Sequence, residues 1–210
     1  MKRILILIML VAPLTCWRRI GSEASAQDRF DASLFAGLNM CQIDGDASAG
    51  YNHPGLRAGV GTSFILGDIR QSSWRMAIEL AFTNKGSYIE DYYRSLSVSY
   101  IEMPVMLVYS AMNDRLRLSA GVAPGVRVAA KVTNDGADDQ LSADNFTPFD
   151  WLPLTASISY RFSDHLGIEG RYQNSMLSIT RKTGSGTYQL FRSNIGCFHN
   201  LVSVGAFYRF

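Results

Sequence analysis

Residues 115–128, "RLRLSAGVAPGVRV", alternate strictly between two kinds of side chain. The even-numbered positions are all apolar, whereas the odd-numbered positions are arginine, serine, glycine and alanine. Successive side chains of a strand point to opposite faces, so this period of two predicts a β-strand with one apolar face. The run is longer than the roughly 9–11 residues with which a tilted strand crosses a bilayer. It therefore favours a strand of membrane-spanning length.

The same alternation recurs along the chain between glycine-rich and turn-forming segments, and a helical period of 3.6 is almost absent. Beyond the first residues there is no apolar run near the roughly 18 residues that a membrane-spanning helix needs. We therefore expect strands at residues 30–40, 55–66, 74–82, 97–109, 115–129, 152–162, 166–174 and 199–210.

The connections between these strands alternate in length. Three are short, at residues 67–73, 110–114 and 163–165. Four are long, at residues 41–54, 83–96, 131–150 and 175–198. An even strand number with short turns on one side and long loops on the other is typical of outer-membrane barrels. The sequence thus predicts an all-β fold, an eight-stranded antiparallel up-and-down transmembrane β-barrel, in the cell outer membrane with both termini periplasmic.

Alternation alone does not tell which face points outward, because a soluble lipocalin-like barrel has the same pattern with its apolar face inside. The aromatic residues favour the membrane. Seven of them share the apolar parity and lie at the short-turn ends of their strands, as an interfacial girdle requires. These residues are Phe30, Trp74, Tyr109, Tyr160, Phe162, Tyr208 and Phe210.

With the apolar face turned to lipid, ten charged residues point into the lumen. They are Arg57, Arg75, Glu79, Glu102, Arg117, Arg127, Arg161, Glu169, Arg171 and Arg209. The interior of an eight-stranded barrel is just wide enough for side chains to fill it, and buried charges need partners. We expect ion pairs with trapped water that fill the barrel; a narrow arginine-lined ion path is the alternative.

Two prolines interrupt strands that otherwise fit the pattern. Proline removes a donor from the β-ladder and normally marks an edge or a bulge. A closed barrel has no edge, so we expect a bulge or a locally broken ladder near Pro104, with Glu102 facing an arginine in the lumen. Pro124 raises the same expectation on the next strand.

The beginning of the chain predicts a secretory signal peptide over residues 1–26, because two basic residues precede an apolar run and small residues end at Ala26. The barrel domain is then 27–210. Cys16 within "PLTC" leaves a lipoprotein as the alternative. Without residues 1–26, the net charge of +2 becomes −1, with 16 basic and 17 acidic residues, and no basic patch argues for nucleic acid.

Two cysteines remain in the mature chain, Cys41 and Cys197, on the long-loop side of the first and last strands. These strands are neighbours where a barrel closes, and the compartment is oxidising. A disulfide that fastens the outer rim is one hypothesis, and two unrelated thiols are the other.

No pattern in the sequence marks a catalytic or metal site. The acidic loop 133–145 lacks the ordered ligand positions of a calcium loop. His53, His165 and His199 are not spaced with serines or acids as in a catalytic set. We expect a non-enzymatic protein without cofactor or metal.

The chain ends on "SVGAFYRF", residues 203–210. Ser203, Gly205, Tyr208 and Phe210 match the polar, glycine, aromatic and aromatic spacing of the terminal signal by which the barrel-assembly machinery recognises its substrates. This ending predicts transient contact with that machinery.

The segments "WRMAIELAFTNKGS" (74–87), "VSYIEMPVMLVYS" (98–110), "LGIEGRYQNSM" (166–176) and "GAFYRF" (205–210) resemble the PorT-like outer-membrane β-barrel family of Bacteroidetes. The resemblance implies an eight-stranded barrel in a Gram-negative outer membrane. PorT itself is associated with type IX secretion. We expect a structural or surface-interaction protein in contact with outer-membrane lipid and a periplasmic or surface protein partner. An accessory of a secretion or assembly machinery and a narrow small-solute pore are the alternatives.

Overall fold

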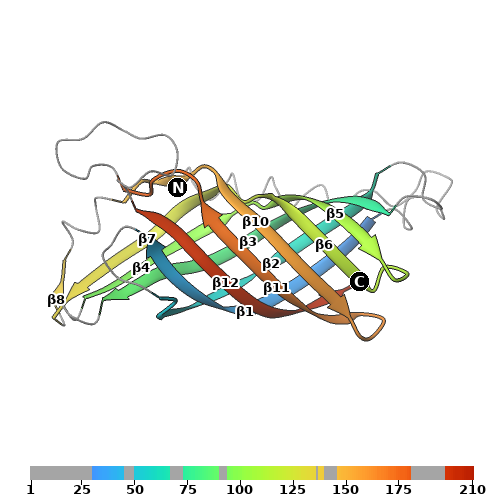
Figure 1. Cartoon of the computed structure of the whole chain (residues 1–210), viewed down its shortest axis with the longest axis horizontal. Helices are drawn as coiled ribbons and strands as arrows, with labels where there is room; N and C mark the ends of the chain where they lie inside the picture. Colours follow the sequence, from blue (N-terminus) through green and yellow to red (C-terminus); the bar gives the residue numbers. More distant parts are fainter. Residues whose placement is uncertain are drawn as a thin grey trace, which may run out of the picture.

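The computed structural model describes residues 30–44, 50–66, 73–89, 94–135, 137–139, 146–180 and 197–210. The expected signal peptide lies outside these residues. Within them the chain forms one antiparallel sheet of strongly tilted strands that closes into a barrel (Figure 1). None of the described residues forms a helix long and apolar enough to cross a membrane.

The sheet contains twelve assigned strands. These are β1 (Phe30–Asp44), β2 (His53–Ile65), β3 (Trp74–Ile89), β4 (Arg94–Glu102), β5 (Val105–Ala111), β6 (Leu116–Val122), β7 (Gly125–Asn134), β8 (Ala137–Asp138), β9 (Phe149–Asp150), β10 (Pro153–Arg161), β11 (Leu166–Ser175) and β12 (Phe198–Arg209).

The barrel has eight strands because three of them are interrupted. Each interrupted strand is divided into two segments, namely β4 and β5, β6 and β7, and β9 and β10. β3 pairs with both β4 and β5, and β4 and β5 pair with β7 and β6, respectively. β7 and β6 in turn pair with β9 and β10. The barrel closes where β1 pairs with both β2 and β12, and β8 is a short addition to β7. The eight-stranded antiparallel fold predicted from the sequence is therefore confirmed.

Prolines cause all three interruptions, and they lie at one level of the barrel. The carbonyls of Pro104, Pro124 and Pro153 accept hydrogen bonds from Glu79, Met103 and Ala123 at 2.9, 2.8 and 2.9 Å. The bonds in the opposite direction are missing because proline has no N–H. The predicted break of the ladder near Pro104 is thus confirmed. The register shift in the pairing of β4 with β7 lies closer to the long-loop end, between Ser99 and Tyr100.

The strands extend further toward the long-loop end than the sequence predicts. β3 reaches Ile89, where the expected strand ended at Phe82. Beyond Phe82 the outward positions become polar, and the Asn84 side chain donates hydrogen bonds to Ser97 and Ser99, both at 3.0 Å. The ladder continues there but the outer face is no longer apolar, so the alternation that identified the strand stops before the strand does.

The outer wall is apolar, with the aromatic girdle at the short-turn end. Trp74 packs edge-on against Tyr109 at 5.2 Å between ring centroids, and Tyr208 packs against Phe210 at 4.9 Å. The backbone N–H of Arg209 donates to the carbonyl of His165 in the β10–β11 turn. The C-terminus therefore lies at the end that carries the short β5–β6 and β10–β11 turns, opposite β8 (Figure 1).

Candidate functional site: the lumen of the barrel

The lumen carries three successive groups of charged side chains, which we name the turn-end, middle and loop-end layers. The turn-end layer consists of Asp31, Arg75, Asp114, Arg117, Arg161 and Arg209. Arg117 is its centre, because its guanidinium lies 2.7 Å from Asp31 and 2.6 Å from Asp114. Both contacts of Arg117 with Asp114 are 2.6 Å long, so this pair is bidentate and charge-assisted.

The tight β5–β6 turn positions Asp114. Three consecutive residues, Met112, Asn113 and Asp114, have left-handed backbone angles with φ of 52°, 53° and 63°. Asparagine and aspartate are enriched in this region, whereas Met112 is unusual there. Burial alone would raise the pKa of the Asp114 carboxyl, but hydrogen bonds and charge from Arg117 outweigh burial and lower this pKa to about 2.

The middle layer joins opposite walls of the barrel. It consists of Arg57, Glu79, Glu169 and Arg171. Glu79 binds Arg57 through one carboxylate oxygen and Arg171 through the other, at 2.8 Å. Glu169 contacts the same two arginines at 3.3 and 3.0 Å. Two arginines and two glutamates thus form a closed, charge-balanced ring.

A cavity of about 70 Å³ with both polar and apolar side chains in its lining lies between the turn-end and middle layers. The polar part of its lining includes Asp31, Ser63, Glu79 and Glu169, and the apolar part includes Met106 and Phe207. A cavity needs roughly 10–15 Å³ of such volume for one water molecule and two to four polar partners to hold it. The cavity therefore suits a small water cluster.

The loop-end layer is completely buried. Lys85 Nζ lies 2.6 Å from Glu102 Oε1 and 3.5 Å from Asp150 Oδ2, and all three side chains have 0% exposure. The expectation that Glu102 faces an arginine is therefore wrong. The sequence assigned Lys85 to a loop, and the extension of β3 brings it into the lumen instead.

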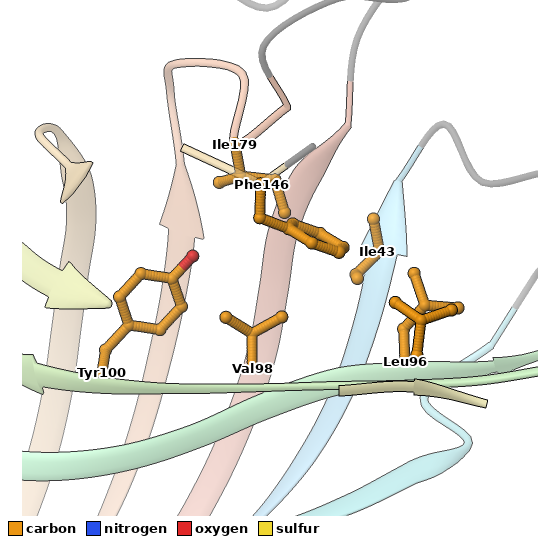
Figure 2. Packing of buried hydrophobic residues seen from close by; sticks show 7 residues of the cluster. Ile43, Leu96, Val98, Tyr100, Phe146 and Ile179 are labelled. Atoms are coloured by element: carbon orange, nitrogen blue, oxygen red, sulfur yellow. The ribbon is translucent and has the colours of Figure 1, made fainter. Parts of the chain in front are cut away.

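Apolar side chains cover the loop-end layer. This apolar cap is formed by Ile43, Leu96, Val98, Tyr100, Val132, Phe146 and Ile179, as Figure 2 shows for most of them. Phe146 and Ile179 come from outside the main strands, and the backbone N–H of Thr147 donates to Ile179 O at 2.7 Å. The cap separates the loop-end layer from the long-loop side.

Arg127, which belongs to none of the three layers, Arg161 of the turn-end layer and the terminal residues also have defined places. Arg127 and Arg161 are half-buried, and Arg161 Nη2 lies 3.9 Å from Asp114. On β12, Ser203 is buried, Gly205 is half-buried and Tyr208 is 38% exposed on the outer wall, and Phe210, directly after β12, is 67% exposed.

No disulfide links Cys41 and Cys197, so the disulfide hypothesis is not supported. Cys41 is paired in register with Leu201, four residues beyond Cys197. Its Sγ is directed toward Asn84 O at 3.7 Å, on β3. The thiol therefore faces away from the position that a bond across the β1–β12 seam would need.

The residues that sequence reasoning missed are mainly acids. The ten charged residues predicted for the lumen were seven arginines and only three glutamates. This excess of positive charge was itself a signal that acidic residues were missing. Asp31 lies on the inward parity of the first strand and could have been found. Asp114 and Asp150 lie in segments assigned to a turn and a loop, where alternation carries no information.

The charged side chains described in the lumen are held in networks of ion pairs. Among the described residues no group of three or more histidine, cysteine, aspartate or glutamate side chains could hold a metal ion. His199 Nε2 lies 3.2 Å from the Tyr100 hydroxyl, and His165 Nδ1 lies 2.8 Å from Arg209 O. These two histidines have structural hydrogen bonds.

A closed eight-stranded barrel with an apolar outer wall and a lumen filled by charged side chains defines a small outer-membrane β-barrel. Residues 24–181 match the family described as outer membrane protein beta-barrel domain, and the chain belongs to this family.

A solved structure agrees on the fold. The chain is similar to the crystal structure of Ail, the attachment invasion locus protein of Yersinia pestis, with 16% identity, a TM-score of 0.51, and coverage of 87% of this chain and 99% of that one. It is similar to Neisserial surface protein A at 10% identity and a TM-score of 0.49, with 87% and 97% covered. A search of curated proteins found no match.

Proposed function

We propose that this protein is a non-enzymatic outer-membrane barrel with an occluded lumen, which holds long loops on a rigid wall in a structural or surface-interaction role. The observation that carries the proposal is the filling of the lumen. Three layers of ion pairs and an apolar cap lie one above another, and the cavity between the first two is only about 70 Å³. This filling, seen in the described residues, supports an interior without a continuous path for a solute.

The proposed orientation places both termini in the periplasm and the long loops outside the cell. It is supported by the short turns and the C-terminus at one end, together with the aromatic girdle. The proposed contacts are outer-membrane lipid along the wall, the assembly machinery at β12 during insertion, and a periplasmic or surface protein. The signal peptide over 1–26 belongs to the same proposal.

Conductance in planar bilayers tests the occluded lumen. The purified barrel should give a flat record at the applied voltages at which a known porin conducts. Stable current steps that scale with the number of inserted barrels would contradict the proposal and support the small-solute pore.

The PorT-like resemblance remains the basis for the alternative of an accessory in type IX-like secretion. No contact within the described residues favours this role over the surface role. Affinity purification from outer membranes separates the two roles, because an accessory should recover secretion components in fixed ratio and a surface protein should not.

A further inference from the structure

The loop-end layer places an amine beside a carboxyl group in a dry site. Lys85 Nζ lies 3.5 Å from Asp150 Oδ2 and 2.6 Å from Glu102 Oε1. The three side chains carry a net charge of −1 and none is exposed. Burying ions is costly unless geometry and hydrogen bonds compensate. A reaction that removes two of these charges would relieve that cost.

The surroundings exclude water. Tyr100 lies against the lysine, with Nζ 5.1 Å from its ring centroid, and Tyr100 is also part of the apolar cap (Figure 2). Condensation of an amine with a carboxyl group releases water, so a site that excludes water and fixes the two groups in contact favours the reaction.

The two oxygens of the Asp150 carboxyl have different surroundings. Oδ2 accepts a hydrogen bond from Ser175 Oγ at 2.6 Å. Oδ1 is buried without a hydrogen-bond partner among the described residues. One oxygen is thus held in place by a donor, as an amide oxygen would be, and the other can leave without breaking a hydrogen bond.

We propose that Lys85 and Asp150 become joined by an intramolecular isopeptide bond, with Glu102 as the catalytic residue that carries the protons. Glu102 takes a proton from the Lys85 ammonium, and the free amine attacks Cγ of Asp150. The new N–C bond replaces the Cγ–Oδ1 bond. Oδ1 leaves as water with two protons from Nζ, both carried by Glu102. No oxidant or co-reactant is needed, and the net charge of −1 remains on Glu102.

The product retains the hydrogen bonds of the site. Glu102 accepts from Thr83 Oγ1 at 2.8 Å and from Gln173 Nε2 at 2.9 Å, and the new amide N–H replaces the ammonium as its third donor. Ser175 continues to donate to Oδ2, which is now the amide oxygen. The bond joins β3 to β9, 65 residues apart in the chain, and such a link restricts the unfolded state.

A second lysine–aspartate pair provides an internal control. Lys131 Nζ lies 3.1 Å from Asp138 Oδ1, closer than Lys85 is to Asp150, but the two side chains are 63% and 52% exposed. Because this pair is exposed to water, its amine and carboxyl groups should not condense.

The test is the mass of the intact, denatured barrel purified from outer membranes, with its N-terminus determined by sequencing. We expect a mass lower than that of the sequence by one water molecule. Trypsin should fail to cleave after Lys85, and peptide 76–94 should be recovered linked to peptide 132–161. A mass equal to that of the sequence, with cleavage after Lys85, overturns the proposal.

Variants distinguish an isopeptide bond between Lys85 and Asp150 from a triad of ions that stays unlinked. Lys85→Arg and Glu102→Gln should restore the full mass, and Asp150→Asn should release ammonia in place of water. Lys131→Arg should keep the loss of one water. If a variant fails to fold, the wild-type mass and peptide map still decide the question. Loss of water that persists in Lys85→Arg would also overturn the proposal.

Discussion

Arg171 Nη2 lies 2.8 Å from Glu79 Oε1, and this contact joins β11 to β3 across the lumen. The two strands are not neighbours in the sheet, so the ion pair connects opposite walls that no backbone hydrogen bond connects. In a soluble domain apolar side chains make such contacts. Here the apolar face is on the outside, so charged side chains hold the walls together.

Replacement of Glu79 should therefore destabilise the barrel strongly. Glu79→Ala leaves Arg57 and Arg171 with Glu169 as their only described acid partner. Removal of one member of a buried ion network costs about 3–5 kcal/mol. Urea unfolding in detergent, followed by tryptophan fluorescence, measures the change. Lys131→Ala, which breaks an exposed pair, should change stability by at most about 1 kcal/mol. Equal effects of the two substitutions would contradict this role of the middle layer.

Asp114 should make stability depend on pH in the acid range. Its folded-state pKa is lowered from 3.8 to about 2, so its contribution is fully present above about pH 4 and is lost as the pH falls through 2. The measurement is the urea midpoint between pH 5 and pH 2 for the wild type and for Asp114→Asn. The difference between the two proteins should shrink as the pH falls. A constant difference would show that the Asp114 charge is not the cause.

The fold could be predicted because lipid imposes a period of two on each strand. The alternation identified the wall between Trp74 and Phe82, and again between residues 115 and 128. It could not locate the ends of the strands on the long-loop side, where Asn84, Ser97 and Ser99 face outward and the outer face is polar.

The sequence predicted that charged side chains fill the lumen, but it did not predict which of these side chains pair with one another. Inward parity identified Arg57, Glu79 and Arg171, since parity requires only the local sequence. The partner of Glu102 depends on how far β3 extends and on a residue of β9, and both are consequences of register. Register across the barrel depends on the closure of the whole sheet.

Loss of the apolar cap should loosen the long-loop end and leave the lumen closed. Phe146 is 3% exposed within the cap, and a buried Phe→Ala replacement costs about 3–5 kcal/mol locally. Phe146→Ala should make the segment around it accessible to protease while the bilayer record stays flat, because the ion-pair layers remain. Met112→Ala, at the opposite end and 68% exposed, is the control and should leave cleavage unchanged. Conductance gained by Phe146→Ala alone would show that the cap, not the ion pairs, closes the barrel.

Deletion of Phe210 should impair insertion more than stability. In the folded barrel its ring is 67% exposed on the outer wall, and its backbone N–H donates one hydrogen bond to Ala32 O at 2.9 Å. Loss of that bond costs about 0.5–1.5 kcal/mol, so the truncated protein refolded in detergent should unfold at nearly the wild-type urea midpoint. Its level in outer membranes should fall several-fold if Phe210 belongs to the signal read during assembly. Phe162→Ala is the matched control, because Phe162 is 59% exposed near the same short-turn end but is not terminal. Two results would contradict this prediction: the truncated protein reaches wild-type levels in outer membranes, or Phe162→Ala lowers the level equally. Either result would show that both rings act in the membrane girdle and that Phe210 is not part of a terminal signal.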